Sequence, residues 1–116
     1  MADYAVYFTW FEFEDNDENG KERPVVVIDN DEETHIYEIL GVYSEKKKYD
    51  HLPLSEKFYK IKDWKSAGLD VPSFIDVSRS VEVTFTELFQ APYKGQLSKH
   101  DVIGLLAKIA IYNFNH

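Results

Sequence analysis

Two arginines stand out among the 13 basic residues of this sequence, Arg23 and Arg79. A guanidinium group stays charged at physiological pH and can bind a phosphate through two parallel hydrogen bonds, which a lysine cannot do. Arg23 directly precedes Pro24, where an acidic segment leads into an apolar one. Phosphate recognition is one interpretation of Arg23, and a structural ion pair with Glu18 or Glu22 is the other.

A second candidate is the polar segment Ser44–Tyr49, which combines a hydroxyl group, three consecutive lysines and a tyrosine. The lysines could bind a phosphate backbone while the tyrosine ring stacks on a base. The same composition is typical of a solvated loop, so both interpretations stay open. His51 is the one histidine near this loop, where it could face a substrate and transfer protons.

Other chemistry is restricted by what the sequence lacks. It contains no cysteine, which excludes disulfides, thiolate zinc sites and cysteine nucleophiles. Its four histidines are far apart in the sequence, so a zinc site would have to be assembled from distant loops. Ser44 lacks the G-x-S-x-G setting of a hydrolase nucleophile, and no glycine-rich nucleotide loop is present. We therefore expect neither a metal nor a cofactor.

The length of 116 residues fits a single domain, residues 1–116, with a core of its own. The net charge of −8 comes mainly from acidic residues in segments 12–22 and 29–33, and it disfavours binding to nucleic acid. These segments are interpreted as solvated loops or, alternatively, as an acidic face that binds a basic partner. No apolar run approaches the roughly 18 residues of a membrane span and no signal sequence is apparent, so we expect a soluble protein without a membrane segment, located in the cytoplasm.

Hydrophobic patterning predicts a mainly β fold that ends in a helix. Apolar and β-branched residues predict strands over Tyr4–Phe13, Pro24–Ile28, His35–Tyr43, Leu52–Ile61 and Ser73–Phe85. Asp63–Gly68 is predicted to form one helical turn. Ser98 followed by Asp101 is a capping pattern for a helix with an apolar stripe at helical spacing, in which Gly104 suggests close packing. About five short strands and a closing helix favour a small barrel.

Four segments, in this order, resemble the PemK/MazF family of toxin endoribonucleases. They are Gly20–Ile28, with a glycine, a spacer, Arg-Pro and an apolar strand; Trp64–Asp76; Asp76–Glu82, with an Asp-x-x-Arg-x-apolar-acid pattern; and Gly95–Ser98, which leads into the closing helix. The similarity spans residues 5–112. It implies a small SH3-like barrel, usually a homodimer, that cleaves single-stranded RNA without metal or cofactor and is inhibited by an antitoxin protein.

The resemblance also implies roles for individual residues. As the 2′-hydroxyl attacks the neighbouring phosphate, Arg23 would stabilise the negative transition state. Ser44 would position or protonate the phosphate. Asp76 would act as general base, which requires a raised pKa. The expected RNA-binding residues are Lys46, Lys47, Lys48, Tyr49, His51 and Arg79, although Arg79 could instead form a structural pair with Glu82.

The sequence departs from the family pattern at three points. Ser73, Phe74 and Ile75 stand where some members have a basic residue before the aspartate, the segment before Arg23 is acidic, and Ala2–Ala5 replaces the usual Gly-Asp opening. These departures favour an alternative function, a non-catalytic barrel of the same fold that acts as a protein-interaction module or as a toxin without ribonuclease activity. No feature recommends a small-molecule binding barrel.

Overall fold

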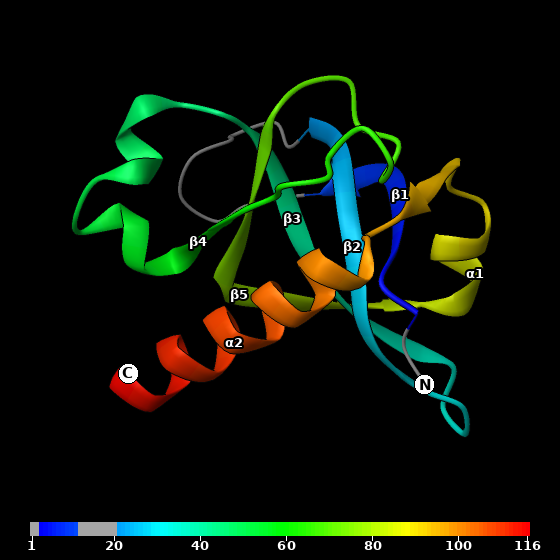
Figure 1. Cartoon of the computed structure of the whole chain (residues 1–116). Coiled ribbons are helices and arrows are strands. Elements are labelled where there is room, and N and C mark those ends of the chain that lie inside the picture. Colours follow the sequence, from blue (N-terminus) through cyan, green and yellow to red (C-terminus); the bar gives the residue numbers. More distant parts are fainter. Residues whose placement is uncertain (1–2, 12–20) are drawn as a thin grey trace.

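The computed structural model describes residues 3–11 and 21–116, which form an antiparallel six-stranded sheet and a C-terminal helix (Figure 1). The strands are β1 (Ala5–Phe11), β2 (Lys21–Asp31), β3 (Ile36–Ser44), β4 (Phe58–Lys60), β5 (Ser73–Thr84) and β6 (Tyr93–Gln96). Their order in the sheet is β4-β5-β3-β2-β1-β6. The helical elements are the 3-10 helices η1 (Lys47–Asp50) and η2 (Leu54–Lys57) and the α-helices α1 (Phe85–Phe89) and α2 (Lys99–Asn115). The predicted fold class is confirmed, although β4 and β6 are separate edges, so the barrel is open.

The sheet buries apolar residues on both faces, and its central strand β2 shows why. Val25, Val26 and Val27 are all at most 2% exposed, although alternate residues of a strand point to opposite faces. Val26 belongs to the core under α2, whereas Val25 and Val27 pack on the opposite face against Leu88 of α1. The continuous apolar run in the sequence therefore marks a strand that is covered on both sides.

Helix α2 crosses one face of the sheet and begins at the predicted cap (Figure 1). The Ser98 hydroxyl accepts a hydrogen bond from the Asp101 backbone N–H and donates one to the Asp63 carboxylate. Gly104 lies against the Tyr59 ring, where an added Cβ would collide with the ring, so the predicted close packing is confirmed. The helix start is thus tied to the segment that follows β4.

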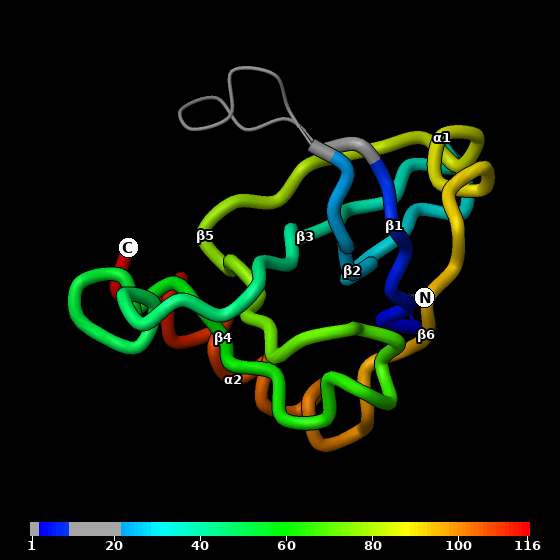
Figure 2. The backbone as a smooth tube through the Cα atoms, turned by 90° about the horizontal axis from the view of Figure 1, so that it is seen from above, coloured from blue at the N-terminus to red at the C-terminus, as the bar shows by residue number. Residues whose placement is uncertain are grey.

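The segment that contains η1 and η2 extends beyond the sheet, and Figure 2 shows it beside the C-terminal part of α2. Lys108 of α2 donates a hydrogen bond of 2.8 Å to the Ser55 carbonyl. This contact attaches the segment that follows Ser44 to the helix. Among the described residues, we find no helix whose length and hydrophobicity would suit a membrane span.

The structure differs from the predictions at β4, α1 and β6. In the predicted strand Leu52–Ile61, only Phe58–Lys60 pairs with β5, because η2 occupies the preceding residues. The single helical turn predicted over residues 63–68 is present: the Ala67 N–H donates to the Asp63 carbonyl at 3.3 Å, and Gly68 ends the turn with a positive φ. The elements α1 and β6 were not predicted. Trp64 packs against the core as expected, whereas the side chain of Trp10 and the acidic segment 12–20 lie outside the described residues.

Gly68 closes the turn after β4 with a left-handed backbone, φ +84°. A Cβ there would collide with the Lys94 carbonyl, so strain and overpacking act together. We expect Gly68→Ala to lower the free energy of unfolding by about 3 kcal/mol. Chemical denaturation checks this, with Ser66→Ala in the same turn as a control expected to cost less than about 1 kcal/mol. Equal stability of the two variants would contradict the packing argument.

Candidate functional site

A groove of about 630 Å³ lies where the first half of β2 and the end of β3 meet the segments after β3 and before β5. Among the described residues, its lining combines three cations, two carboxylates, a serine pair and an apolar wall. These residues are Phe8, Glu22, Arg23, Pro24, Val42, Tyr43, Ser44, Lys46, Lys48, Tyr49, Leu69, Asp70, Val71 and Ser73. The groove therefore offers both charge for a phosphate and apolar surface for a ring.

Strand register places Arg23 in this groove. Arg23 pairs with Thr9 of β1, and two residues further along β2 Val25 pairs with Gly41 of β3. Continuing this antiparallel register brings Arg23 opposite Tyr43, on the same face of the sheet. The guanidinium carbon indeed lies 4.5 Å from the centre of the Tyr43 ring, within the range of a cation–π interaction.

Tyr43 belongs to a cluster of aromatic rings at one end of the groove. Its ring packs edge-on against Phe58 at 5.8 Å and against Tyr49 at 6.4 Å, and Tyr49 stacks on Phe58 at 4.1 Å. Phe74, only 1% exposed, closes the cluster from β5. Such edge-on and stacked pairs restrict ring orientation, so the tyrosine under Arg23 is held in place by its neighbours.

The phenol groups of this cluster remain protonated. Burial raises the pKa of Tyr43 well above its usual value; the Asp76 carboxylate raises it further, while Arg23 and Arg79 act in the opposite direction. Burial also raises the pKa of Tyr49, and Arg23 opposes that effect. Both phenols are therefore neutral at physiological pH and can donate hydrogen bonds, but they do not serve as bases.

The structure brings several predicted RNA-binding residues together and leaves others out. Ser44, Lys46, Lys48 and Tyr49 line the groove with Arg23. Lys47 and His51 are exposed and are not part of the lining. These placements leave the functional roles of all six residues as predictions.

Asp76 and Arg79 of β5 also lie outside the groove lining, although both act on Tyr43 electrostatically. Asp76 is 9% exposed, and its Oδ1 accepts hydrogen bonds from the Ser78 backbone N–H at 2.8 Å and the Ser78 hydroxyl at 2.6 Å. A general base needs hydrogen-bond reach to the proton that it removes. The predicted catalytic role of Asp76 would therefore require a substrate to reach past the lining.

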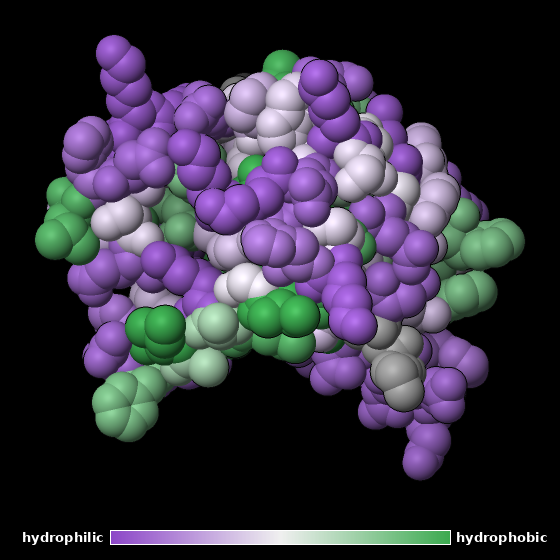
Figure 3. Space-filling view, viewed as in Figure 1, coloured by the Kyte–Doolittle hydropathy of each residue, from purple (hydrophilic) through white to green (hydrophobic). Residues whose placement is uncertain are grey.

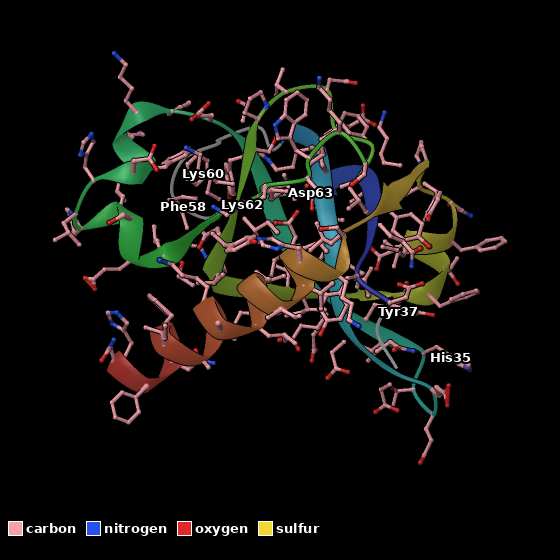
Figure 4. The ribbon with its side chains drawn as sticks, viewed as in Figure 1. His35, Tyr37, Phe58, Lys60, Lys62 and Asp63 are labelled. Atoms are coloured by element: carbon pink, nitrogen blue, oxygen red, sulfur yellow. The ribbon has the colours of Figure 1, made fainter. Side chains whose placement is uncertain are left out.

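A larger cavity of about 770 Å³ lies at the β2–β3 hairpin, lined by residues that include Asp31, Glu32, His35, Tyr37 and Phe85. Figure 4 shows His35 and Tyr37 on one side of the molecule and Phe58 and Lys60 of β4 on the other. We favour the smaller groove as the functional site because it contains the cations. Within residues 3–11 and 21–116, no group of three or more histidines or carboxylates is arranged to hold a metal ion.

The fold is similar to that of known structures. MazF from Deinococcus radiodurans superimposes with a TM-score of 0.64 at 15% identity, covering 94% of this chain and 91% of that one. MazF in the MazE-MazF complex from the same organism gives a TM-score of 0.61 at 14% identity, with the same coverage. No protein-family model and no curated protein matches the sequence. The resemblance to PemK/MazF toxins is therefore confirmed in the fold: this chain has the fold of MazF.

Proposed function

We propose that the protein is a toxin-type endoribonuclease that cleaves single-stranded RNA in this groove. The observation that carries the proposal is the guanidinium of Arg23, held 4.5 Å from the Tyr43 ring centre in a groove that also contains Ser44, Lys46 and Lys48. Lysines can bind the phosphate backbone, and the apolar wall and tyrosines can pack against unstacked bases. The MazF-like fold supports the same function by analogy only, because one fold can host several activities.

The proposed reaction is an internal phosphoryl transfer. The ribose 2′-oxygen forms a bond to the adjacent phosphorus, and the bond from phosphorus to the 5′-oxygen breaks, leaving a 2′,3′-cyclic phosphate and a 5′-hydroxyl. Arg23 stabilises the extra negative charge of the transition state. Ser44 donates a hydrogen bond to the phosphate, and Asp76 accepts the 2′-hydroxyl proton if the substrate reaches it.

Incubation of the purified chain with a mixed-sequence single-stranded RNA in EDTA tests this function. We expect cleavage with cyclic phosphate ends, since no step of the proposed reaction uses a metal. Intact RNA after incubation with folded protein would sink the ribonuclease proposal. If cleavage requires an added metal ion, the proposed mechanism is wrong, but single-stranded RNA is still the substrate.

The lysines of the groove give a prediction about salt dependence. Each phosphate contact to a single strand contributes about 0.7 to the slope of log affinity against log salt concentration. We expect Lys46→Ala and Lys48→Ala each to lower this slope by about 0.7, measured with a 2′-deoxy oligonucleotide that cannot be cleaved. Lys99→Ala, in the first turn of α2, is the control, because it removes the same charge outside the groove lining. Equal changes for all three variants would argue against specific contacts in the groove.

We also propose a cytoplasmic protein of one domain, residues 1–116, that forms a homodimer and is inhibited by an antitoxin. One MazF neighbour was solved in complex with MazE.

Figure 3 shows hydrophobic side chains in a row along α2. The exposed apolar residues of this helix are Ile103, Leu106, Ile111 and Phe114. An exposed apolar row suits an interface, and a monomer in sedimentation at micromolar concentration would count against the dimer.

A second candidate function is a non-catalytic interaction module. Its specific support is Asp76, which is bonded to Ser78 and lies outside the groove lining. This alternative predicts a folded protein that leaves RNA intact and does not bind the 2′-deoxy oligonucleotide. The salt titration described above therefore tests the alternative independently of the cleavage assay.

A further inference from the structure

We propose that Tyr43 is a positioning residue for Arg23, whose aromatic ring holds the guanidinium in the orientation that a scissile phosphate needs. The inference rests on the proposed ribonuclease function and assigns a role to a residue that sequence reasoning did not single out. Its geometric basis is the 4.5 Å distance from the Arg23 Cζ to the ring centre.

The ring lies at a junction between the predicted functional residues. The Tyr43 ring lines the groove together with Arg23 and Ser44. Its phenol group interacts electrostatically with Asp76 and Arg79. Strand β3 positions it, since Tyr43 pairs with Phe74 of β5 on one side and its register faces Arg23 of β2 on the other. Tyr43 therefore lies opposite Arg23 in the register, and its phenol is close enough to β5 for the charges of Asp76 and Arg79 to act on it.

The ring is itself restrained, which a platform for a cation requires. Phe58 and Tyr49 contact it edge-on, at interplanar angles of 85° and 77°. A guanidinium that is stacked on a fixed ring has fewer accessible orientations than an unrestrained one. It therefore loses less conformational entropy when it contacts the phosphate in the transition state. Loss of the ring should consequently reduce kcat more than it raises KM.

Two variants separate the ring from the hydroxyl group, and a third is the control. Tyr43→Phe keeps the ring, and we expect its kcat to stay within about three-fold of wild type. Tyr43→Leu removes the ring, and we expect kcat to fall about ten-fold, the size of one cation–π interaction, with KM changed less than about three-fold. Tyr37→Leu is the matched control, a tyrosine on the same strand that lines the distant hairpin cavity, and its kinetics should be unchanged.

A double-mutant cycle with Arg23 excludes a merely structural effect. In an Arg23→Ala background, Tyr43→Leu should cost less than about two-fold further, because the two residues act as one unit. Additive losses, or a Tyr43→Phe variant as impaired as Tyr43→Leu, would overturn the inference. Circular dichroism shows whether each variant is folded. If Tyr43→Leu does not fold, the kcat of Tyr43→Phe still tests the inference, because a large loss in this variant would contradict it.

Failure of the inference and failure of the proposed function give different results. If wild type cleaves RNA and Tyr43→Leu cleaves it equally well, the inference alone fails. If wild type cleaves no RNA, the ribonuclease proposal fails, and the positioning role, which concerns a scissile phosphate, fails with it.

Discussion

Arg23→Ala is expected to lower kcat for RNA cleavage by about 10²- to 10³-fold, the loss seen when one donor that stabilises a transition-state charge is removed. The physical reason is that the phosphoryl group gains negative charge as the 2′-oxygen attacks, and Arg23 is the only guanidinium in the groove lining. Because the ground-state phosphate already carries a charge, binding also weakens, but the effect on kcat should dominate. Initial rates with a defined oligonucleotide under saturating conditions measure this.

Arg23→Lys sharpens this prediction, since it keeps the charge but loses the planar fork. We expect kcat at least about ten-fold below wild type, because a lysine donates to phosphate at a single point and cannot stack in the same way on Tyr43. Lys99→Ala, an exposed cation in the first turn of α2, is the control and should cleave as wild type does. Full activity in Arg23→Ala would remove Arg23 from the mechanism and favour the interaction module.

The second large effect is expected at Asp101, which is fully buried at the start of α2. Its Oδ1 accepts hydrogen bonds from the Tyr59 hydroxyl at 2.6 Å and the Lys62 backbone N–H at 2.9 Å, and its Oδ2 accepts one from the Asp63 N–H at 2.8 Å. Asp101→Asn replaces one acceptor oxygen with an NH₂ group that faces a donor. We expect the free energy of unfolding to fall by about 3 kcal/mol and the melting temperature by roughly 10 °C.

The same carboxylate makes stability depend on pH. Burial alone raises the pKa of Asp101, but hydrogen bonds from Tyr59, Lys62, Asp63 and Ser98 outweigh it and hold the pKa below its usual value. The unfolded chain therefore binds a proton more readily than the folded one. The stabilisation is present above the unfolded pKa of about 3.9 and is lost as the pH falls through the lower folded pKa.

Urea denaturation between pH 7 and pH 2.5 tests both statements about Asp101. Wild type should lose stability toward acid, and Asp101→Asn should show a shallower loss because it cannot be protonated there. Asp50→Asn is the control, since this exposed carboxylate lies 4.0 Å from Lys60 and should contribute less than about 1 kcal/mol. An Asp101→Asn variant as stable as wild type would show that the buried hydrogen bonds contribute little.

Elements with a strong local pattern were predictable from the sequence. The Ser98 cap and the apolar spacing after it predicted α2, and the run Pro24–Ile28 predicted the central strand, because both patterns match one period of secondary structure. The capping box of α1, Thr84 with Glu87, was also present in the sequence as a signal for that short helix. Strand β6 has no such signal, since its four residues become a strand only by pairing with β1.

The wrong prediction of a continuous strand over Leu52–Ile61 has a physical cause. The segment 52–61 is apolar enough for a strand, but residues 54–57 pack as a 3-10 helix beside α2, and only Phe58–Lys60 pair with β5. A short apolar run does not by itself distinguish these outcomes, because tertiary contacts outweigh the small differences in propensity. The barrel is open between β4 and β6 because these two strands do not pair with each other, and composition does not predict strand pairing.

The sequence by itself determined the mainly β fold with its closing helix, the similarity to MazF-like toxins, and Arg23 and the lysine segment as candidate functional residues. Only the tertiary structure decided which candidates meet: Arg23, Ser44, Lys46 and Lys48 share a groove that Lys47 and His51 do not line. It also decided that Tyr43 contacts Arg23, and that the Asp101 carboxylate binds the segment after β4 while Ser98 caps α2. The reason is that strand register and helix docking bring together residues far apart in the sequence, and a pattern with a period of two or 3.6 residues carries no information about such pairs.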